Sequence, residues 1–237
     1  MRYLYVYPHP DDESFGPAPA MYMQRRQGSD VYLLTLTRGG ATRQRHRFGY
    51  SIEEMGEIRY KEMRRVAEVL DLSGLHILDF PDSALKNLDP RLLVEEICRE
   101  IEALKPDVLV SYPIHGISGF HDHLVTHAVV KHAFLTSRER FGSPQRLAFH
   151  TLTEEEASDS GVFPLHGSST EEIDCFIHVE DIDIQRTHMA LDCYETFSVT
   201  IEKTGIKEKI QRIVPFEIFM ETWDPPLTDL AEGLHGQ

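Results

Sequence analysis

Apolar segments of strand length alternate with helical patterns along the first two thirds of the chain, and this alternation limits the folds open to it. The aromatic and β-branched content of buried strands recurs at residues 3–7, 31–37, 75–80, 108–112 and 146–152. Helical spacing or start signals between them predict helices at 16–27, after Ser51, after Asp89 and at 124–134. Such alternation is typical of an α/β protein, and it predicts a three-layer, Rossmann-like, mostly parallel sheet with helices on both faces.

The last third of the chain is less regular. Residues 153–170 are acidic and rich in Ser and Gly, which predicts an insertion loop. A strand at 174–179, a helix at 182–194 and a late pair of strands within 209–223 are expected to follow it. The 237 residues contain no internal repeat. We therefore expect a single domain over 1–237, with the chemical motifs confined to about 1–135.

The charge balance narrows the possible partners. The chain has 24 Lys and Arg against 39 Asp and Glu, a net charge of −15, which argues against nucleic acid or an anionic membrane as a partner. No apolar run approaches the roughly 18 residues of a spanning helix. The first residues enter a strand with no signal peptide, and the three cysteines are scattered. These features predict a cytoplasmic protein.

Polar clusters follow the predicted strands where each strand ends. The run His-Pro-Asp-Asp-Glu at 9–13 follows the first strand, Asp82 follows the third, and His115 with His121–His123 follow the fourth. The carboxyl ends of parallel strands meet at one edge of a sheet, so these groups are expected to gather there. Adjacent acids repel one another in a place shielded from water, and a divalent cation is the simplest compensation. Loop histidines held by backbone carbonyls are the alternative.

Two of these clusters resemble the signatures of a known family. The sequence PHPDDESFG at 8–16 resembles the amino-terminal motif of the LmbE-like/PIG-L zinc-dependent N-deacetylases, and GFHDH at 119–123 resembles their second motif, G-H-P-D-H. The segments LTRG at 36–39 and FPD at 80–82 agree with that family, as do Arg59 and Glu62. The resemblance covers residues 1–135 well and the rest only loosely.

The resemblance implies a ligand set and a reaction. In the family, the positions of His9, Asp12 and His123 bind one zinc ion per chain, and the position of Asp11 is the general base. Zinc in a hydrolytic site takes three protein ligands and activates a water molecule. The implied function is removal of an acetyl group from an N-acetylglucosamine-type sugar conjugate. Asp122 is expected to orient a histidine of the site.

The chain departs from the family at Phe120, where the family has the histidine that stabilises the oxyanion. We predict that His121 takes this catalytic role, one residue later. His115, or the metal alone, is the alternative, and His121 is then a surface residue. Glu13 is expected either to support the site or to be an ordinary solvated acid.

Substrate contacts are indicated more weakly. Arg59 and Asp82 match family positions that contact the sugar, although each suits a structural ion pair equally well. Arg38 begins the basic stretch of the chain, which continues through Arg43, Arg45, His46 and Arg47. This stretch is predicted to be either a solvated loop or a mobile loop that meets an anionic group of the substrate.

Two other functions stay open at this point. One is hydrolysis of another small amide, which would differ in the lining of the pocket. The other is a metal-binding protein whose catalysis has lapsed; Phe120 supports it, whereas the retained Asp11 speaks against it. In each case the partner is a small molecule, and self-association is left open by the sequence.

Overall fold

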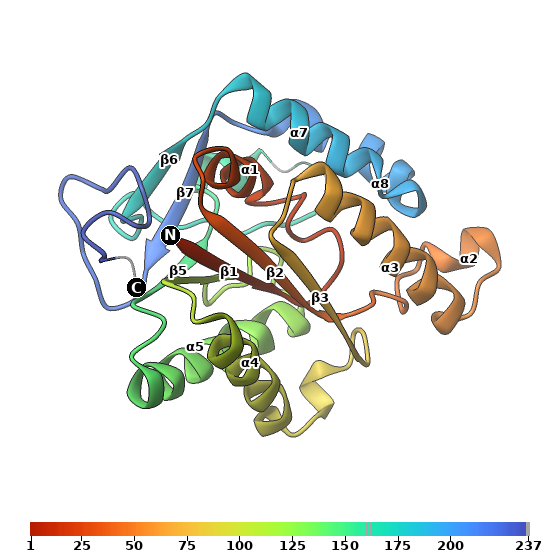
Figure 1. Cartoon of the computed structure of the whole chain (residues 1–237). Coiled ribbons are helices and arrows are strands. Elements are labelled where there is room, and N and C mark those ends of the chain that lie inside the picture. Colours follow the sequence, from red (N-terminus) through yellow and green to blue (C-terminus); the bar gives the residue numbers. More distant parts are fainter. Residues whose placement is uncertain (160, 162, 236–237) are drawn as a thin grey trace.

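The sheet of the protein has seven strands in the order β3-β2-β1-β4-β5-β7-β6 (Figure 1). The computed structural model describes residues 1–159, 161 and 163–235. The strands are β1 (Arg2–Tyr7), β2 (Asp30–Thr37), β3 (Gly74–Phe80), β4 (Val108–Ser111), β5 (Arg146–His150), β6 (Cys175–His178) and β7 (Ile213–Ile218). Strands β3, β2, β1, β4 and β5 are parallel, and β7 pairs antiparallel with both β5 and β6. The predicted mostly parallel α/β sheet is confirmed.

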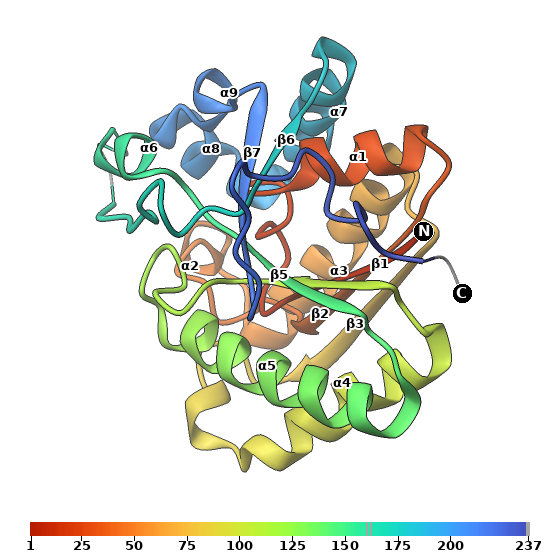
Figure 2. The same cartoon turned by 90° about the vertical axis from the view of Figure 1, so that its left-hand side faces the viewer.

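Helices cover both faces of this sheet, as the two views show (Figures 1 and 2). One face carries α1 (Ala18–Arg26), α3 (Ile52–Val69) and α7 (Asp181–Asp192), and the other carries α4 (Pro90–Leu104) and α5 (His121–Phe141). The shorter helices are α2 (Arg45–Phe48), α6 (Glu154–Ser158), α8 (Ser198–Thr204) and α9 (Ile206–Lys209). Two 3-10 turns lie at Leu85–Asn87 and Glu195–Phe197.

The central strand β1 shows why the sheet has two cores. Side chains of a strand alternate between its faces. Tyr3, Tyr5 and Tyr7 accordingly pack in the core that includes α1, α3 and α7, whereas Leu4 and Val6 pack against α4 and α5. All five side chains are buried, so β1 ends inside the molecule. The polar run that follows β1 therefore starts at a position largely shielded from water.

The structure differs from three of the predicted elements. Helix α5 begins at His121, three residues before the predicted start, so residues 121–123 form its first turn. The predicted loop at 153–170 contains α6, which begins with a capping box between Thr153 and Glu156; residues 160 and 162 of that loop lie outside the described part. A single strand, β7, replaces the expected pair within 209–223, because its partners are β5 and β6.

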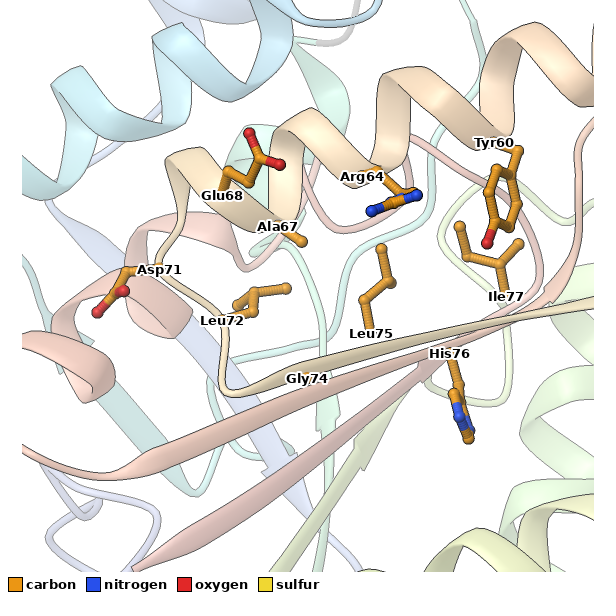
Figure 3. Close-up of a pocket in the computed structure, with 10 residues that line it drawn as sticks. All are labelled: Tyr60, Arg64, Ala67, Glu68, Asp71, Leu72, Gly74, Leu75, His76 and Ile77. Carbon is orange, nitrogen blue, oxygen red and sulfur yellow. The ribbon is translucent and has the colours of Figure 1, made fainter.

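A surface hollow of about 620 Å³ lies between α3 and the edge strand β3 (Figure 3). Tyr60 and Arg64 of α3 line it, together with Leu75 and Ile77 of β3. None of the polar residues that follow the strand ends lines this hollow. It is therefore separate from the site described next. Across the described residues, no helix is both long and apolar enough to cross a bilayer.

Candidate metal centre and active site

The turn after β1 directs two adjacent acids in different directions. Asp11 has a φ of 91°, in a region that residues other than glycine rarely adopt. Its carbonyl oxygen accepts hydrogen bonds from the backbone N–H groups of Ser14 and Phe15, both at 2.9 Å, and these bonds hold the turn in this conformation. As a result the carboxylate of Asp12 faces two histidines, whereas that of Asp11 faces Arg59.

His9, Asp12 and His123 bring their ligand atoms together at one point. Oδ2 of Asp12 lies 3.4 Å from Nδ1 of His9, and Oδ1 lies 3.4 Å from Nε2 of His123. Two donors bound at about 2.0–2.1 Å to one tetrahedral zinc ion are about 3.3 Å apart. Both observed distances are close to this value, and the ligand atoms of all three residues lie within 4.8 Å of one another.

The second ring nitrogen of His9 faces two further carboxylates. Nε2 lies 3.3 Å from Asp82 and 3.4 Å from Asp122. Asp82 is held by the backbone N–H of Ala41 at 2.6 Å, and Asp122 by that of Leu85 at 3.2 Å. A carboxylate that accepts the N–H of a ligating imidazole fixes its tautomer and leaves the other nitrogen for the metal. Asp122 thus lies beside a histidine as expected, and Asp82 shares this position with it. His9, Asp82 and Asp122 also form a second possible ligand group.

His123 is held from both sides by the backbone and by a tyrosine. Its Nδ1 donates to the carbonyl oxygen of Gly116 at 2.9 Å, which leaves Nε2 directed at Asp12. The ring stacks on Tyr112 with centroids 4.2 Å apart, and the hydroxyl of Tyr112 donates to Asp12 at 2.8 Å. A Cβ atom at Gly116 would lie 2.8 Å from that of His123, so this close approach requires glycine.

Electrostatics at this point favour a positive charge. Burial alone would lower the pKa of His9, but the surrounding Asp12, Asp122 and Asp82 carboxylates outweigh it and raise the pKa well above its usual value. Burial alone would raise the pKa of Asp12, whereas His123 and His9 bring it down to about 2. Asp12 is therefore an ionised acceptor. A proton or a divalent cation can supply the positive charge that the cluster favours.

Asp11 stands apart from the metal cluster and is held by a buried arginine. Arg59 is 2% exposed, and its Nη2 donates to Oδ2 of Asp11 at 2.7 Å and also to the carbonyl oxygen of Pro10. Its Nη1 reaches the carbonyl oxygen of Gly39 at 3.3 Å, and its guanidinium lies 3.9 Å from the ring centroid of Phe197. Burial raises the pKa of Asp11 to about 7, although the Arg59 guanidinium opposes this rise. Such a pKa suits a base that works near neutral pH.

We expect Arg59→Met to destabilise the fold. Removing one partner of a buried ion pair leaves the other charge without compensation, and the expected loss in the free energy of unfolding is about 3 kcal/mol. Urea denaturation measures it. Arg64→Met on the same helix is the matched control, because Arg64 is exposed and a surface change there costs less than about 0.5 kcal/mol. In an Asp11→Asn background, Arg59→Met should lower the free energy of unfolding by less, because no buried carboxylate is then left without its partner. An equal loss in both backgrounds would contradict the pairing.

Glu13 is completely buried, which contradicts the alternative of a solvated acid and leaves that of a residue supporting the site. Its Oε1 accepts hydrogen bonds from the Ser14 hydroxyl at 2.6 Å and from the Tyr194 hydroxyl at 2.7 Å. Sequence reasoning missed Tyr194, and it also missed Tyr112. The aromatic ends of the strand at 108–112 and of the helix at 182–194 were visible, but nothing in the sequence showed which carboxylates their hydroxyls meet.

The structure brings only some of the other predicted residues to the cluster. Phe120 is 58% exposed, and its ring meets His123 edge to face at a centroid distance of 5.5 Å. His121 is exposed and, among the described residues, its side chain has no hydrogen-bond partner. His115 bonds to Ser168 at 3.3 Å, away from His9.

Two of the residues predicted to contact substrate, Arg38 and Arg59, form ion pairs with carboxylates of the protein. Arg38 pairs with Glu57 and, at 3.2 Å, with Asp79, and a contact of Arg38 with substrate stays a prediction that these pairs do not favour. Arg59 is buried against Asp11, and a direct contact of its side chain with substrate stays a prediction that its burial does not favour.

The first half of the chain also matches a known family as a whole. Residues 4–134 match the family model PIG-L, GlcNAc-PI de-N-acetylase, and this match covers more than half of the 237 residues. The chain belongs to the PIG-L family. The cluster of His9, Asp12 and His123 lies entirely within the matched residues.

Individual relatives of this PIG-L chain act on amides of small molecules. It is 32% identical over 152 residues to a mycothiol S-conjugate amidase of Streptomyces coelicolor, a match that covers 56% of this chain and 52% of the relative. It is 30% identical over 166 residues to a probable N-acetyl-alpha-D-glucosaminyl L-malate deacetylase 2 of Bacillus anthracis, covering 69% and 70%. The chain spans about half the length of the first of these relatives.

A solved structure extends the likeness to the whole fold. The deacetylase of the teicoplanin biosynthesis pathway superposes with a TM-score of 0.69 at 13% identity, and the match covers 92% of this PIG-L chain and 97% of that one. At this identity the likeness concerns the fold alone. It includes the last third of the chain, which the family model does not reach.

Proposed function

We propose that this protein is a zinc-dependent N-deacetylase that removes the acetyl group from an N-acetylglucosamine-type sugar conjugate. The observation that carries the proposal is the division of the turn at 9–13: His9 and Asp12 join His123 in a three-ligand cluster, while Asp11 stays outside it. Metal binding alone does not require Asp11 in that position.

The donor set fits zinc better than the hard divalent cations. Two imidazoles and one carboxylate are ligands that zinc favours, whereas Mg²⁺ and Ca²⁺ prefer sites made of oxygen atoms. When bound, zinc would supply an activated water and polarise the carbonyl of the substrate amide. We propose one ion per chain, held by His9, Asp12 and His123.

Asp11 is proposed to move the proton. Its carboxylate is free of the cluster and lies one residue from the ligand Asp12, so it can accept a proton from the attacking water. It can then pass that proton to the departing amine, which leaves as a neutral group. Arg59 fixes the direction of this carboxylate through the 2.7 Å bond to Oδ2, and the other oxygen stays available.

The relatives support the substrate class. The relative from Bacillus anthracis is described as a deacetylase of an N-acetylglucosaminyl malate, and the family model is described by a de-N-acetylase of GlcNAc-PI. Both names contain an N-acetylated glucosamine. The related amidase of Streptomyces coelicolor supports cleavage of another small amide as the alternative within the same chemistry.

A screen for released amine tests the proposal. Zinc-loaded protein is incubated with a panel of N-acetylated sugars and N-acyl amines, and free primary amine is measured with a fluorogenic reagent. We expect release from N-acetylglucosamine derivatives with zinc and much less after chelation. Release from N-acyl amines but not from sugars would favour the alternative amide. A zinc-bound protein that releases nothing from any member would support lapsed catalysis.

The oxyanion contact is the least defined part of the site. We propose that His121 donates to the developing oxyanion, because its exposed side chain lies at the start of α5, two residues before His123, and is free to turn. His121→Ala should then lower turnover by about 10- to 10³-fold with unchanged zinc content. His132→Ala is the control, since His132 is exposed on the same helix. A silent His121→Ala together with a damaging His115→Ala would assign the role to His115.

A further inference from the structure

A short stretch of concentrated positive charge stands out in this acidic protein. Residues 43–47, here called the basic segment, contain Arg43, Arg45, His46 and Arg47, whereas the whole chain has a net charge of −15. Within the part of the chain that the structure describes, none of these three arginines forms an ion pair with a carboxylate. Unpaired like charges repel one another, so their grouping needs an explanation.

The basic segment lies at the edge of the candidate active site. Asp82, which is 3.3 Å from His9, also accepts the backbone N–H of Ala41 at 2.6 Å. The carbonyl oxygen of Ala41 in turn accepts a bond from Nη1 of Arg45 at 2.9 Å. The Asp82 carboxylate and the backbone of Ala41 therefore link the Arg45 guanidinium to His9. Figure 1 shows α2 on the side of the sheet where the parallel strands end.

Hydrogen bonds connect this segment, predicted to be either a solvated loop or a mobile loop, to neighbouring residues. Arg45 also bonds to the carbonyl oxygen of Thr42 at 3.1 Å, and the side-chain amide of Gln44 donates to Thr200 of α8 at 2.8 Å. Arg47 donates to Gln44 at 3.0 Å. The bonds of Arg45 and Arg47 use only part of guanidinium groups that have five N–H donors each, so donors remain for a ligand.

We propose that the basic segment binds an anionic group, a carboxylate or a phosphate, on the part of the substrate beyond the acetylated sugar. This inference rests on the proposed deacetylase function, because it places the sugar at His9. Guanidinium groups bind both anions through paired hydrogen bonds. Hydrogen bonds already hold those of Arg45 and Arg47. Arg38 does not contribute, since Glu57 and Asp79 neutralise it.

Three substrates that differ in one group test the proposal. They are the methyl glycoside, the carboxymethyl glycoside and the 1-phosphate of N-acetylglucosamine. We expect kcat/KM to be about 10-fold or more higher for at least one anionic substrate, as for a charge-assisted hydrogen bond. The triple variant Arg43→Gln, Arg45→Gln, Arg47→Gln should lose that preference and keep its activity on the methyl glycoside. Comparison of the 1-phosphate with the carboxymethyl glycoside shows whether the phosphate or the carboxylate is preferred.

Arg64→Gln is the matched control, because Arg64 is an exposed arginine that lines the separate hollow of Figure 3 and forms no ion pair with any residue that the structure describes. It should keep the anionic preference. Arg43→Gln alone removes no described hydrogen bond, so it serves if the triple variant does not fold. Equal activity of the parent on all three substrates, or a preference that survives the triple substitution, overturns the proposal.

A binding measurement separates this proposal from the deacetylase proposal. Calorimetry compares glucosamine 1-phosphate and carboxymethyl glucosaminide with methyl glucosaminide on the parent and the triple variant, and it needs no turnover. Arginine-dependent binding of either anionic sugar by a protein that releases no amine would reject the deacetylase and retain the anion site. Amine release without any arginine-dependent anion binding would reject the anion site and retain the deacetylase.

Discussion

Asp11→Asn is expected to keep the zinc and the fold and to lower the turnover rate by about 10²-fold or more. The amide has nearly the size of the carboxylate, and its oxygen can still accept the hydrogen bond from Arg59 that the structure shows at 2.7 Å. It cannot accept a proton at neutral pH, and the loss of a general base has an effect of this order. Initial rates of amine release, with zinc measured on the same samples, give the result.

Asp79→Asn is the control for this substitution, because Asp79 is exposed and pairs with Arg38 rather than with the site. It should work at the parent rate. If Asp11→Asn works at the parent rate as well, Asp11 is not the base. If it loses zinc instead, Asp11 belongs to the ligand set, and the proposed division of the turn at 9–13 is wrong.

His123→Ala is expected to remove most of the bound zinc and, with it, the activity. His123 is one of the three proposed protein ligands, and its Nε2 lies 3.4 Å from Asp12. Water in its place cannot restore a similar affinity, because the ion then keeps only two protein contacts. Elemental analysis after dialysis against zinc-free buffer measures the occupancy.

His127→Ala is a close control for the loss of His123. His127 lies one turn later on α5, is buried like His123, and also bonds through Nδ1 to a carbonyl oxygen, that of Tyr112 at 2.9 Å. It belongs to neither candidate ligand group among the described residues. Its variant should therefore keep the zinc. Full occupancy in His123→Ala would instead favour the group formed by His9, Asp82 and Asp122.

The elements of the fold that depend on a few neighbouring residues could be predicted from the sequence. The strand that becomes β1 and the capping box at Ser51 were both found, because each depends on a few adjacent residues. The start of α5 was missed, since Phe120 offers no capping side chain and the polar residues 121–123 do not show an apolar face. Strand β7 was misread because its neighbours, β5 and β6, are distant in sequence.

The residues of the candidate site were named from the sequence, whereas most of their contacts were not predicted. His9, Asp12 and His123 were named from motif positions, and the structure brings them together. The burial of Arg59 was not foreseen, although it lies four residues after the buried Met55 and four before the buried Met63, on the inner face of α3. That spacing was the available signal. A charged residue is rarely buried unless it is paired, and the sequence did not show that Asp11 is the partner of Arg59.

The hydrogen bond between Tyr194 and Glu13 joins two positions 181 residues apart. Tyr194 lies outside the residues 4–134 that match the family model, yet it completes the support of the turn inside them. The turn that carries the family motif therefore depends on a hydroxyl from outside the matched segment, which the motifs alone do not reveal. Grafting the first half of this chain onto the second half of a distant relative would therefore require this contact to be rebuilt.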